Sequence, residues 1–402
     1  MKKITILLLI ITFWSCGKDD IVSPKIPQVF DVDEIISAGS KLIITGKDLD
    51  DSPTIIFNEK IIAPLSTTNS EITITIPENA SSGKLKIKFE QEAYNTEKFL
   101  KVLDKGWNVF EASNYFQIKF VSDHVGFAKK SESGKNIIDK TIDGGKTWSS
   151  ILEELSPTGN LAVVSNQVVF IRTTSNNIKK TTDGGATWQD IKVLDLSYII
   201  DKLYFENAQK GFIVAQKLGK SHVFKTIDGG NTWNEVLQID TPTYKIEIVY
   251  QKEDTILLLD RENNKFIKTE DAGINWSTTN SNFVSPYPIT HNFITQHTAW
   301  LYLKRFFDKG YELFNTTDQG NTWKSIEFPK LAETIVKITF FNELNGHLLT
   351  DKGSSLYTSD GGETWKHYHI DSEYITAATT FENTLYIIAN GKLLTKKIIP
   401  KS

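Results

Sequence analysis

A nine-residue motif that occurs six times constrains this chain of 402 residues more than any other feature. At its centre is an aspartate, followed by glycine two positions later and by tryptophan five positions later. Successive aspartates are 40, 45, 43, 47 and 42 residues apart, a spacing typical of four-stranded β-propeller blades. The copies are KTIDGGKTW (140–148), KTTDGGATW (180–188), KTIDGGNTW (225–233), KTEDAGINW (268–276), NTTDQGNTW (315–323) and YTSDGGETW (357–365).

The fixed positions of the motif predict a β-hairpin. The aspartate can accept hydrogen bonds from the backbone N–H groups after it, and the glycine can adopt positive φ without a Cβ clash. The threonine two positions before the aspartate suits the incoming strand, and the tryptophan begins the outgoing strand. We interpret these positions as structural: Asp143, Gly145, Trp148, Asp183, Gly185, Trp188, Asp228, Gly230, Trp233, Asp271, Gly273, Trp276, Asp318, Gly320, Trp323, Asp360, Gly362 and Trp365.

The motif resembles the Asp box, also called the BNR repeat. In families that carry it, these hairpins lie at the blade periphery and are structural, so the resemblance implies no direct functional role for the box residues. A phosphate-binding loop would need a helix after the glycines, and no helical pattern follows them.

Segments without a box set the expected number of blades. Residues 375–380, 384–389 and 392–398 look like three strands after the sixth box, and 107–110 looks like a lone strand before the first blade. Joining them completes a seventh blade and removes exposed strand edges. We therefore expect a seven-bladed propeller over residues 106–402, closed by its N-terminal strand; the alternative is six blades with an extra C-terminal hairpin.

The repeats together resemble the BNR-like photosystem II stability and assembly factor family. They are more loosely similar to sialidases, sortilin-type receptors and Asp-box glycoside hydrolases. This resemblance rests on the boxes and the blade count, and it carries over no functional residue.

The N-terminus resembles a bacterial lipoprotein signal. Lys2 and Lys3 precede an apolar run from Ile4 to Trp14, which is shorter than the roughly 20 residues of a membrane-spanning helix. The stretch Phe13-Trp14-Ser15-Cys16 resembles a lipobox, which implies a signal peptide (1–15), lipidation of Cys16 and a tether (16–23). We expect a lipid anchor in the outer membrane, facing the periplasm or the cell surface.

Residues 24–103 predict a separate β-sandwich. Alternating strands at 41–45, 54–57, 71–76 and 84–89 are divided by turn residues, as in immunoglobulin-like folds. The segment resembles an IPT/TIG domain in its Gly39 and Gly46 pair, its Ile76-Pro77 step and its Ser82-Gly83 turn. The whole chain is thus expected to be all-β, an Ig-like sandwich followed by the propeller.

Composition narrows the function. The net charge of -4 gives no basis for a nucleic-acid partner, and one cysteine rules out an intramolecular disulfide or a cysteine-based zinc site. Sialidases need three converging arginines, and the chain has only Arg172, Arg261 and Arg305. His367 and His369 form an alternate pair without an evident third ligand, so we expect no metal, and no cofactor is implied.

One set of aromatic residues is a candidate binding face. Tyrosines near the start of five inner strands would lie on one face of the disc, where a ring and a hydroxyl suit sugar or protein contacts. The alternative is that they pack between blades. These residues are Tyr115, Tyr198, Tyr244, Tyr287 and Tyr374.

These features favour a non-catalytic cell-envelope lipoprotein that binds a protein complex or a glycan as a scaffold. No constellation of nucleophile, base and oxyanion donor is evident, and no catalytic residue is assigned. Two alternatives stay open: a glycoside hydrolase or sialidase-like enzyme, and an assembly factor for a membrane or periplasmic complex.

Overall fold

The computed structural model describes residues 26–50, 52–90, 94–155, 159–173, 176–280, 287–295, 297–304, 311–329, 333–369 and 375–398. Regular structure in these residues is almost all β, and helix is limited to short 3₁₀ turns such as η2 (Thr243–Lys245). In this part of the chain no helix is both long and apolar enough to cross a membrane. The signal peptide, the tether and Cys16 lie outside the described residues, as does Tyr374.

Contacts divide the chain into two compact units. Among the described residues, the first takes in 26–33, Lys41–Thr75 and Lys84–Phe99. The second holds Glu34–Ser40, Ile76–Gly83 and residues 100–398. This division cuts through the segment expected to form one sandwich, so the domain bounds derived from sequence stay a prediction.

The N-terminal strands form two sheets. One has the order β1-β3-β7-β6 and the other β2-β9-β8-β4-β5, in which β2 runs parallel to β9. Strand β3 shows the alternation that the sequence predicted, with Leu42 and Ile44 buried and the lysines at its ends exposed. The strands are β1 (Gln28–Val32), β2 (Ile35–Ser37), β3 (Lys41–Lys47), β4 (Thr54–Phe57), β5 (Lys60–Ile62), β6 (Ser66–Thr67), β7 (Glu71–Thr75), β8 (Gly83–Lys88) and β9 (Thr96–Leu103).

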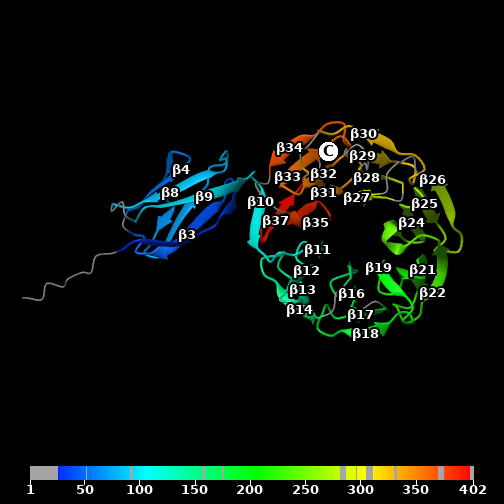
Figure 1. The fold of residues 1–402 in the computed structure, drawn as a ribbon. Helices are drawn as coiled ribbons and strands as arrows, with labels where there is room; N and C mark the ends of the chain where they lie inside the picture. Colours follow the sequence, from blue (N-terminus) through cyan, green and yellow to red (C-terminus); the bar gives the residue numbers. More distant parts are fainter. Residues whose placement is uncertain are drawn as a thin grey trace, which may run out of the picture. The chain divides into compact units, whose positions relative to one another are not determined.

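The remaining strands form four-stranded antiparallel sheets that follow one another around a ring (Figure 1). The first sheet contains β11 (Gln117–Phe120), β12 (Gly126–Glu132), β13 (Lys135–Thr141) and β14 (Ser149–Glu154). The second contains β15 (Leu161–Val163), β16 (Val169–Arg172), β17 (Asn177–Thr181) and β18 (Gln189–Lys192). The third contains β19 (Ile199–Phe205), β20 (Gly211–Lys217), β21 (Lys220–Thr226) and β22 (Asn234–Ile239).

The next three sheets repeat this order. The fourth contains β23 (Ile246–Lys252), β24 (Thr255–Asp260), β25 (Lys265–Thr269) and β26 (Ser277–Asn280). The fifth contains β27 (Tyr287–Phe293), β28 (Ala299–Lys304), β29 (Tyr311–Thr316) and β30 (Lys324–Ile326). The sixth contains β31 (Ile335–Phe340), β32 (Gly346–Thr350), β33 (Ser354–Thr358) and β34 (Lys366–His369).

One further sheet combines strands from far apart in the sequence. Its order is β10-β37-β36-β35, with β10 (Trp107–Glu111), β35 (Ile375–Phe381), β36 (Thr384–Ala389) and β37 (Lys392–Lys397). Strand β10 pairs antiparallel with β37 from Trp107, opposite Lys396, to Glu111, opposite Lys392.

Stacked aromatic rings join neighbouring sheets near the ends of the inner strands. Phe205 stacks on Phe170 of the preceding sheet with ring centroids 3.4 Å apart, and Phe120 stacks on Tyr386 of β36 at 3.8 Å. A glycine opposite each phenylalanine makes room for the ring, because a Cβ on Gly211 would lie 2.6 Å from the Phe205 ring. The glycine that begins β12 and the one that begins β20 therefore reflect packing against these rings.

A buried threonine hydroxyl organises each box. In the third box, the hydroxyl of Thr226 accepts the N–H of Gly230 at 2.9 Å and donates to Oδ1 of Asp228 at 2.8 Å. Asp228 also accepts the N–H and the hydroxyl of Thr232, and the hydroxyl contributes most to lowering its pKa to about 2. The matching Gly-to-Thr bond is 2.8–3.0 Å long in all six boxes.

Each box also contacts its neighbours. Gly185 has φ +100 and lies against Ile151 of the preceding sheet, so closely that an added Cβ would come within 2.6 Å of that side chain. In the other direction, the ammonium of Lys180 lies 5.1 Å from the ring centroid of Phe170 and donates to the carbonyls of Ala208 and Gly229 in the next sheet. A box is therefore both a turn and a connection between sheets.

Replacing Thr226 by valine tests the role of the hydroxyl. The shape is retained, but the N–H of Gly230 is left buried without an acceptor, which should cost about 1–3 kcal/mol of unfolding free energy. Thr232→Val is the matched control in the same box, because Thr232 is exposed and water can replace its hydroxyl. Urea unfolding measures both, and an equal loss in the two variants would contradict this account.

Candidate functional site

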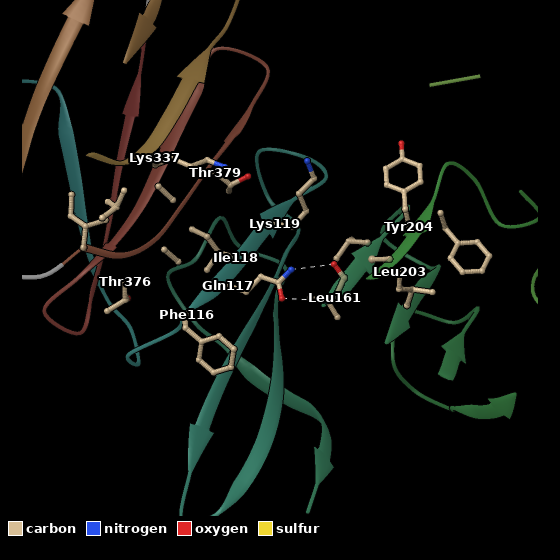
Figure 2. Close-up of a pocket in the computed structure, with 17 residues that line it drawn as sticks. Phe116, Gln117, Ile118, Lys119, Leu161, Leu203, Tyr204, Lys337, Thr376 and Thr379 are labelled. Carbon is tan, nitrogen blue, oxygen red and sulfur yellow. Dashed lines mark hydrogen bonds between the residues drawn. The ribbon is translucent and has the colours of Figure 1, made fainter. Parts of the chain in front are cut away.

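A cavity of about 510 Å³ lies among the inner strands of the ring (Figure 2). Residues of five strands line it, β11, β15, β19, β31 and β35, together with Phe116 just before β11. Apolar groups such as Leu203 and Val336 alternate with polar ones such as Gln117, Tyr204 and Thr379. A cavity of this size and mixed lining is within the usual range for ligand pockets.

Side-chain amides hold the inner strands side by side. The amide of Gln117 on β11 donates to the carbonyl of Leu161 on β15 and accepts its N–H, both at 3.2 Å (Figure 2). On the other side of the ring, Asn292 of β27 accepts the N–H of Phe340 at 2.8 Å. Because the inner strand of each sheet has one edge without a ladder partner, these amides satisfy backbone groups that would otherwise lack a partner.

Two lysines supply the charge of the cavity lining. Lys119 on β11 and Lys337 on β31 are both lining residues (Figure 2). Lys119 is exposed and Lys337 is half-buried, and desolvation by the protein around them lowers the pKa of each. The positive charge of Lys119 lowers the pKa of Lys337 further.

A third inner-strand lysine is neutralised. The ammonium of Lys202 on β19 lies 3.3 Å from a carboxylate oxygen of Glu247 and 3.7 Å from one of Asp201. The imidazole of His291 on β27 lies within the influence of these charges. Burial lowers the pKa of His291 to about 4, with Glu247 opposing the shift and Lys337 adding to it, so the ring is neutral at pH 7.

A second pair of cations lies beside the cavity lining. The ammonium of Lys129 is 5.2 Å from the ring centroid of Phe116 and donates to the carbonyl of Gly159 at 2.8 Å. Burial, together with the nearby charge of Arg172, lowers the pKa of Lys129 to about 8. Positive charge therefore extends from the cavity to the strands next to it.

The tyrosines proposed as a binding face have different surroundings. Tyr115 is 1 % exposed and donates to Oδ2 of Asp139 at 2.6 Å, so it is a packing residue and cannot offer its ring to a ligand. Tyr198 is half-buried against Phe224, whereas Tyr244 is 61 % exposed. Tyr287 lies at the start of β27, but its side chain and the whole of Tyr374 lie outside the described residues.

Other residues singled out in the sequence are not among the residues that line the cavity. The guanidinium of Arg261 donates to the carbonyl of Tyr244, Arg172 ends β16, and Arg305 lies outside the described residues. His367 is exposed on β34. Among the described residues no group of three or more His, Cys, Asp or Glu side chains is arranged to hold a metal ion.

The box residues occupy the connections between third and fourth strands. Their tryptophans are all half-buried, and the indole N–H donates to nearby backbone carbonyls, as Trp233 does to Gly230 at 2.9 Å. All six box glycines have positive φ, between +82 and +101.

Sequence reasoning did not single out Lys119 and Lys337. Both interrupt apolar inner strands, in Gln117-Ile-Lys-Phe120 and Ile335-Val-Lys-Ile338. The sequence signal for them is a lysine inside a strand that is predicted to be innermost. Such a strand has no face on the outer surface of a ring, so the lysine there is unlike an ordinary surface lysine.

No model of a known protein family matches the sequence, and no curated protein matches it. Solved structures do resemble the fold. YCF48 from Cyanidioschyzon merolae has a TM-score of 0.56 at 16 % identity, covering 72 % of this chain and 98 % of that one. A structure of YCF48 bound to D1 peptide has a TM-score of 0.57 at 16 % identity (73 % and 97 % covered).

The chain contains a β-propeller. Virginiamycin B lyase from Staphylococcus aureus, an enzyme, is similar to the same extent, with a TM-score of 0.56 at 11 % identity, covering 73 % of this chain and 99 % of that one. At these identities the likeness extends to the fold alone, and it leaves open whether the chain is an enzyme.

Proposed function

We propose that this protein is a non-catalytic binding protein of the cell envelope, which holds a protein partner as a scaffold or assembly factor. The observation that carries the proposal is the composition of the cavity. Among its described lining residues are two lysines but no aspartate, glutamate, histidine or cysteine. A glycoside hydrolase would need a pair of carboxyl groups there, whereas a binding site needs only shape and complementary charge.

A protein partner fits better than a glycan for two reasons. The sequence resembles the BNR-like assembly factor family, and a structure with a similar fold is YCF48 bound to D1 peptide. Arginine shortage further disfavours a sialoside ligand, because a carboxylate held in sialidase fashion needs converging guanidinium groups.

The proposal includes a closed, seven-bladed ring as its rigid platform. Two contacts support this count. Gly145 of the first box lies against Leu393 of β37, as Gly185 lies against Ile151, and Phe120 stacks on Tyr386 as Phe205 stacks on Phe170. The sheet that contains β10 thus contacts the β11–β14 sheet in the way that consecutive sheets contact one another.

Truncation distinguishes seven blades from six. Removing residues 372–402 deletes β35 to β37, which should open a seven-bladed ring and abolish its cooperative unfolding. Removing only 399–402 is the control and should leave the thermal transition unchanged. If the longer truncation melts at the temperature of the full chain, the six-bladed alternative is correct.

The N-terminal part of the chain completes the proposal. An IPT/TIG-like sandwich over 24–103 would act as a spacer, and a lipid on Cys16 would anchor the protein to the outer membrane. This arrangement is supported by the lipobox-like stretch and by the two sheets of short alternating strands. A multi-chain lipid anchor gives stable attachment, because each buried methylene contributes about 0.8 kcal/mol.

Replacing Cys16 by alanine tests the anchor. Without the thiol no lipid can be attached, so the protein should move from the membrane fraction to the soluble fraction. Cell fractionation with immunoblotting measures this shift, and incorporation of labelled palmitate checks the wild type. Membrane attachment that persists in Cys16→Ala, or a wild type that takes up no label, would show that Cys16 is not lipidated.

Affinity capture of the intact protein from its own solubilised membranes tests the function. We expect stoichiometric recovery of an envelope protein, and no product from a panel of polysaccharides and sialosides incubated with the same preparation. A glycan array run in parallel tests the alternative: binding to a glycan without captured protein would show that the ligand is a sugar. Reproducible sugar release that depends on a single carboxylate of this chain would overturn the non-catalytic proposal.

A further inference from the structure

The two cavity lysines lack a counter-charge. Neither the ammonium of Lys119 nor that of Lys337 forms a hydrogen bond or ion pair with any residue in the described part of the chain. Lys202, also on an inner strand, differs because Glu247 neutralises it. Placing two like charges in one partly enclosed space is unfavourable unless an anion is bound between them. Because the chain as a whole carries a net charge of -4, this positive charge is a local feature.

The dimensions of the cavity restrict what that anion can belong to. A volume of about 510 Å³ admits a small molecule or a few residues of extended chain, but not a folded domain. The five lining strands are all innermost in their sheets, so each has an edge without a ladder partner. Edge groups that no side chain occupies, unlike those of Leu161 and Phe340, can pair with an extended peptide. Lining groups such as Phe116, Leu203 and Tyr204 offer both apolar and hydroxyl contacts to its side chains.

We propose that this cavity binds the carboxylate of an extended acidic peptide segment, with Lys119 and Lys337 as its two counter-charges. The inference rests on the proposed function, since the peptide would be part of the protein partner. Carboxylates form charge-assisted hydrogen bonds with ammonium groups, and enclosure by protein strengthens them. Lys129, which lies over the ring of Phe116, and the nearby charge of Arg172 add to the positive potential on that side of the cavity.

The probe is a fluorescein-labelled library of octapeptides with five random positions followed by three glutamates and a free carboxyl terminus. Three matched libraries have an amidated end, three glutamines in place of the glutamates, or both changes. Fluorescence polarisation with the full chain measures binding. The amidated acidic library and the free-acid glutamine library show whether side-chain or terminal carboxylates are bound. Binding of the acidic libraries should weaken as NaCl is raised.

The decisive variant is Lys119→Met with Lys337→Met, which retains most of the side-chain volume. We expect at least about a tenfold loss of affinity for the acidic peptides. The control, Lys192→Met with Lys324→Met, removes the same charge from exposed positions on β18 and β30 and should bind as the wild type does. The cavity variant should melt no lower than the wild type, because it removes two unpaired charges. Lys119→Gln with Lys337→Gln, and Lys192→Gln with Lys324→Gln as its control, repeat the comparison with polar side chains.

Several results would overturn the inference. Among them are acidic peptides that fail to bind the wild type, equal binding to the cavity variant, and equal binding of the neutral library. Glutarate or glucuronate that binds as tightly as the peptides would make the cavity a small-anion site. A partner captured by the wild type despite such results leaves the proposed function intact, whereas the absence of any captured partner contradicts the proposed function itself.

Discussion

The six sheets that carry an Asp box depend on the hydrogen bonds of one buried threonine hydroxyl in each box. The six box threonines are only 1–2 % exposed, and each hydroxyl both accepts a backbone N–H and donates to the box aspartate. A hydroxyl is the one small group that can do both at a buried position. It fixes the turn between the third and fourth strands. This turn positions the glycine and the lysine that contact the adjoining sheets.

Packing between sheets follows from this turn. Because Gly185 has no side chain, Ile151 of the preceding sheet can lie directly against the backbone of the box. On the opposite side, Lys140 and Lys180 each donate to a box carbonyl of the next sheet, that of Gly184 or Gly229, and lie over a phenylalanine ring of their own sheet. Local turn chemistry and the association of sheets are therefore set by the same few residues.

The sequence could predict these strands because their signals are local. Alternation and turn residues placed the last three strands at 375–380, 384–389 and 392–398, within one residue of β35 to β37. All six copies carry the box threonine, but a β-branched residue suits a strand for its shape alone, so the sequence indicated no role for the hydroxyl. The hydroxyl has its effect only once the chain turns back and brings the glycine N–H within reach.

Long-range contacts explain what the sequence could not predict. Tyr115 and Tyr244 both precede an inner strand, yet one is buried and the other is 61 % exposed. The difference depends on Asp139, which lies 24 residues along the chain and accepts the hydroxyl of Tyr115. Local pattern contains no information about that bond, so position before a strand was a poor guide to a binding face.

The cavity differs from the boxes in having polar groups that the fold does not use. In the boxes, as Asp228 illustrates, the polar groups are engaged by one another, so that a ligand would have to break hydrogen bonds that hold the turn. Around the cavity, Gln117 and Asn292 satisfy backbone groups of neighbouring inner strands, while the ammonium groups of Lys119 and Lys337 are left over. The fold therefore does not use these two ammonium groups, which is why we propose that they bind a ligand.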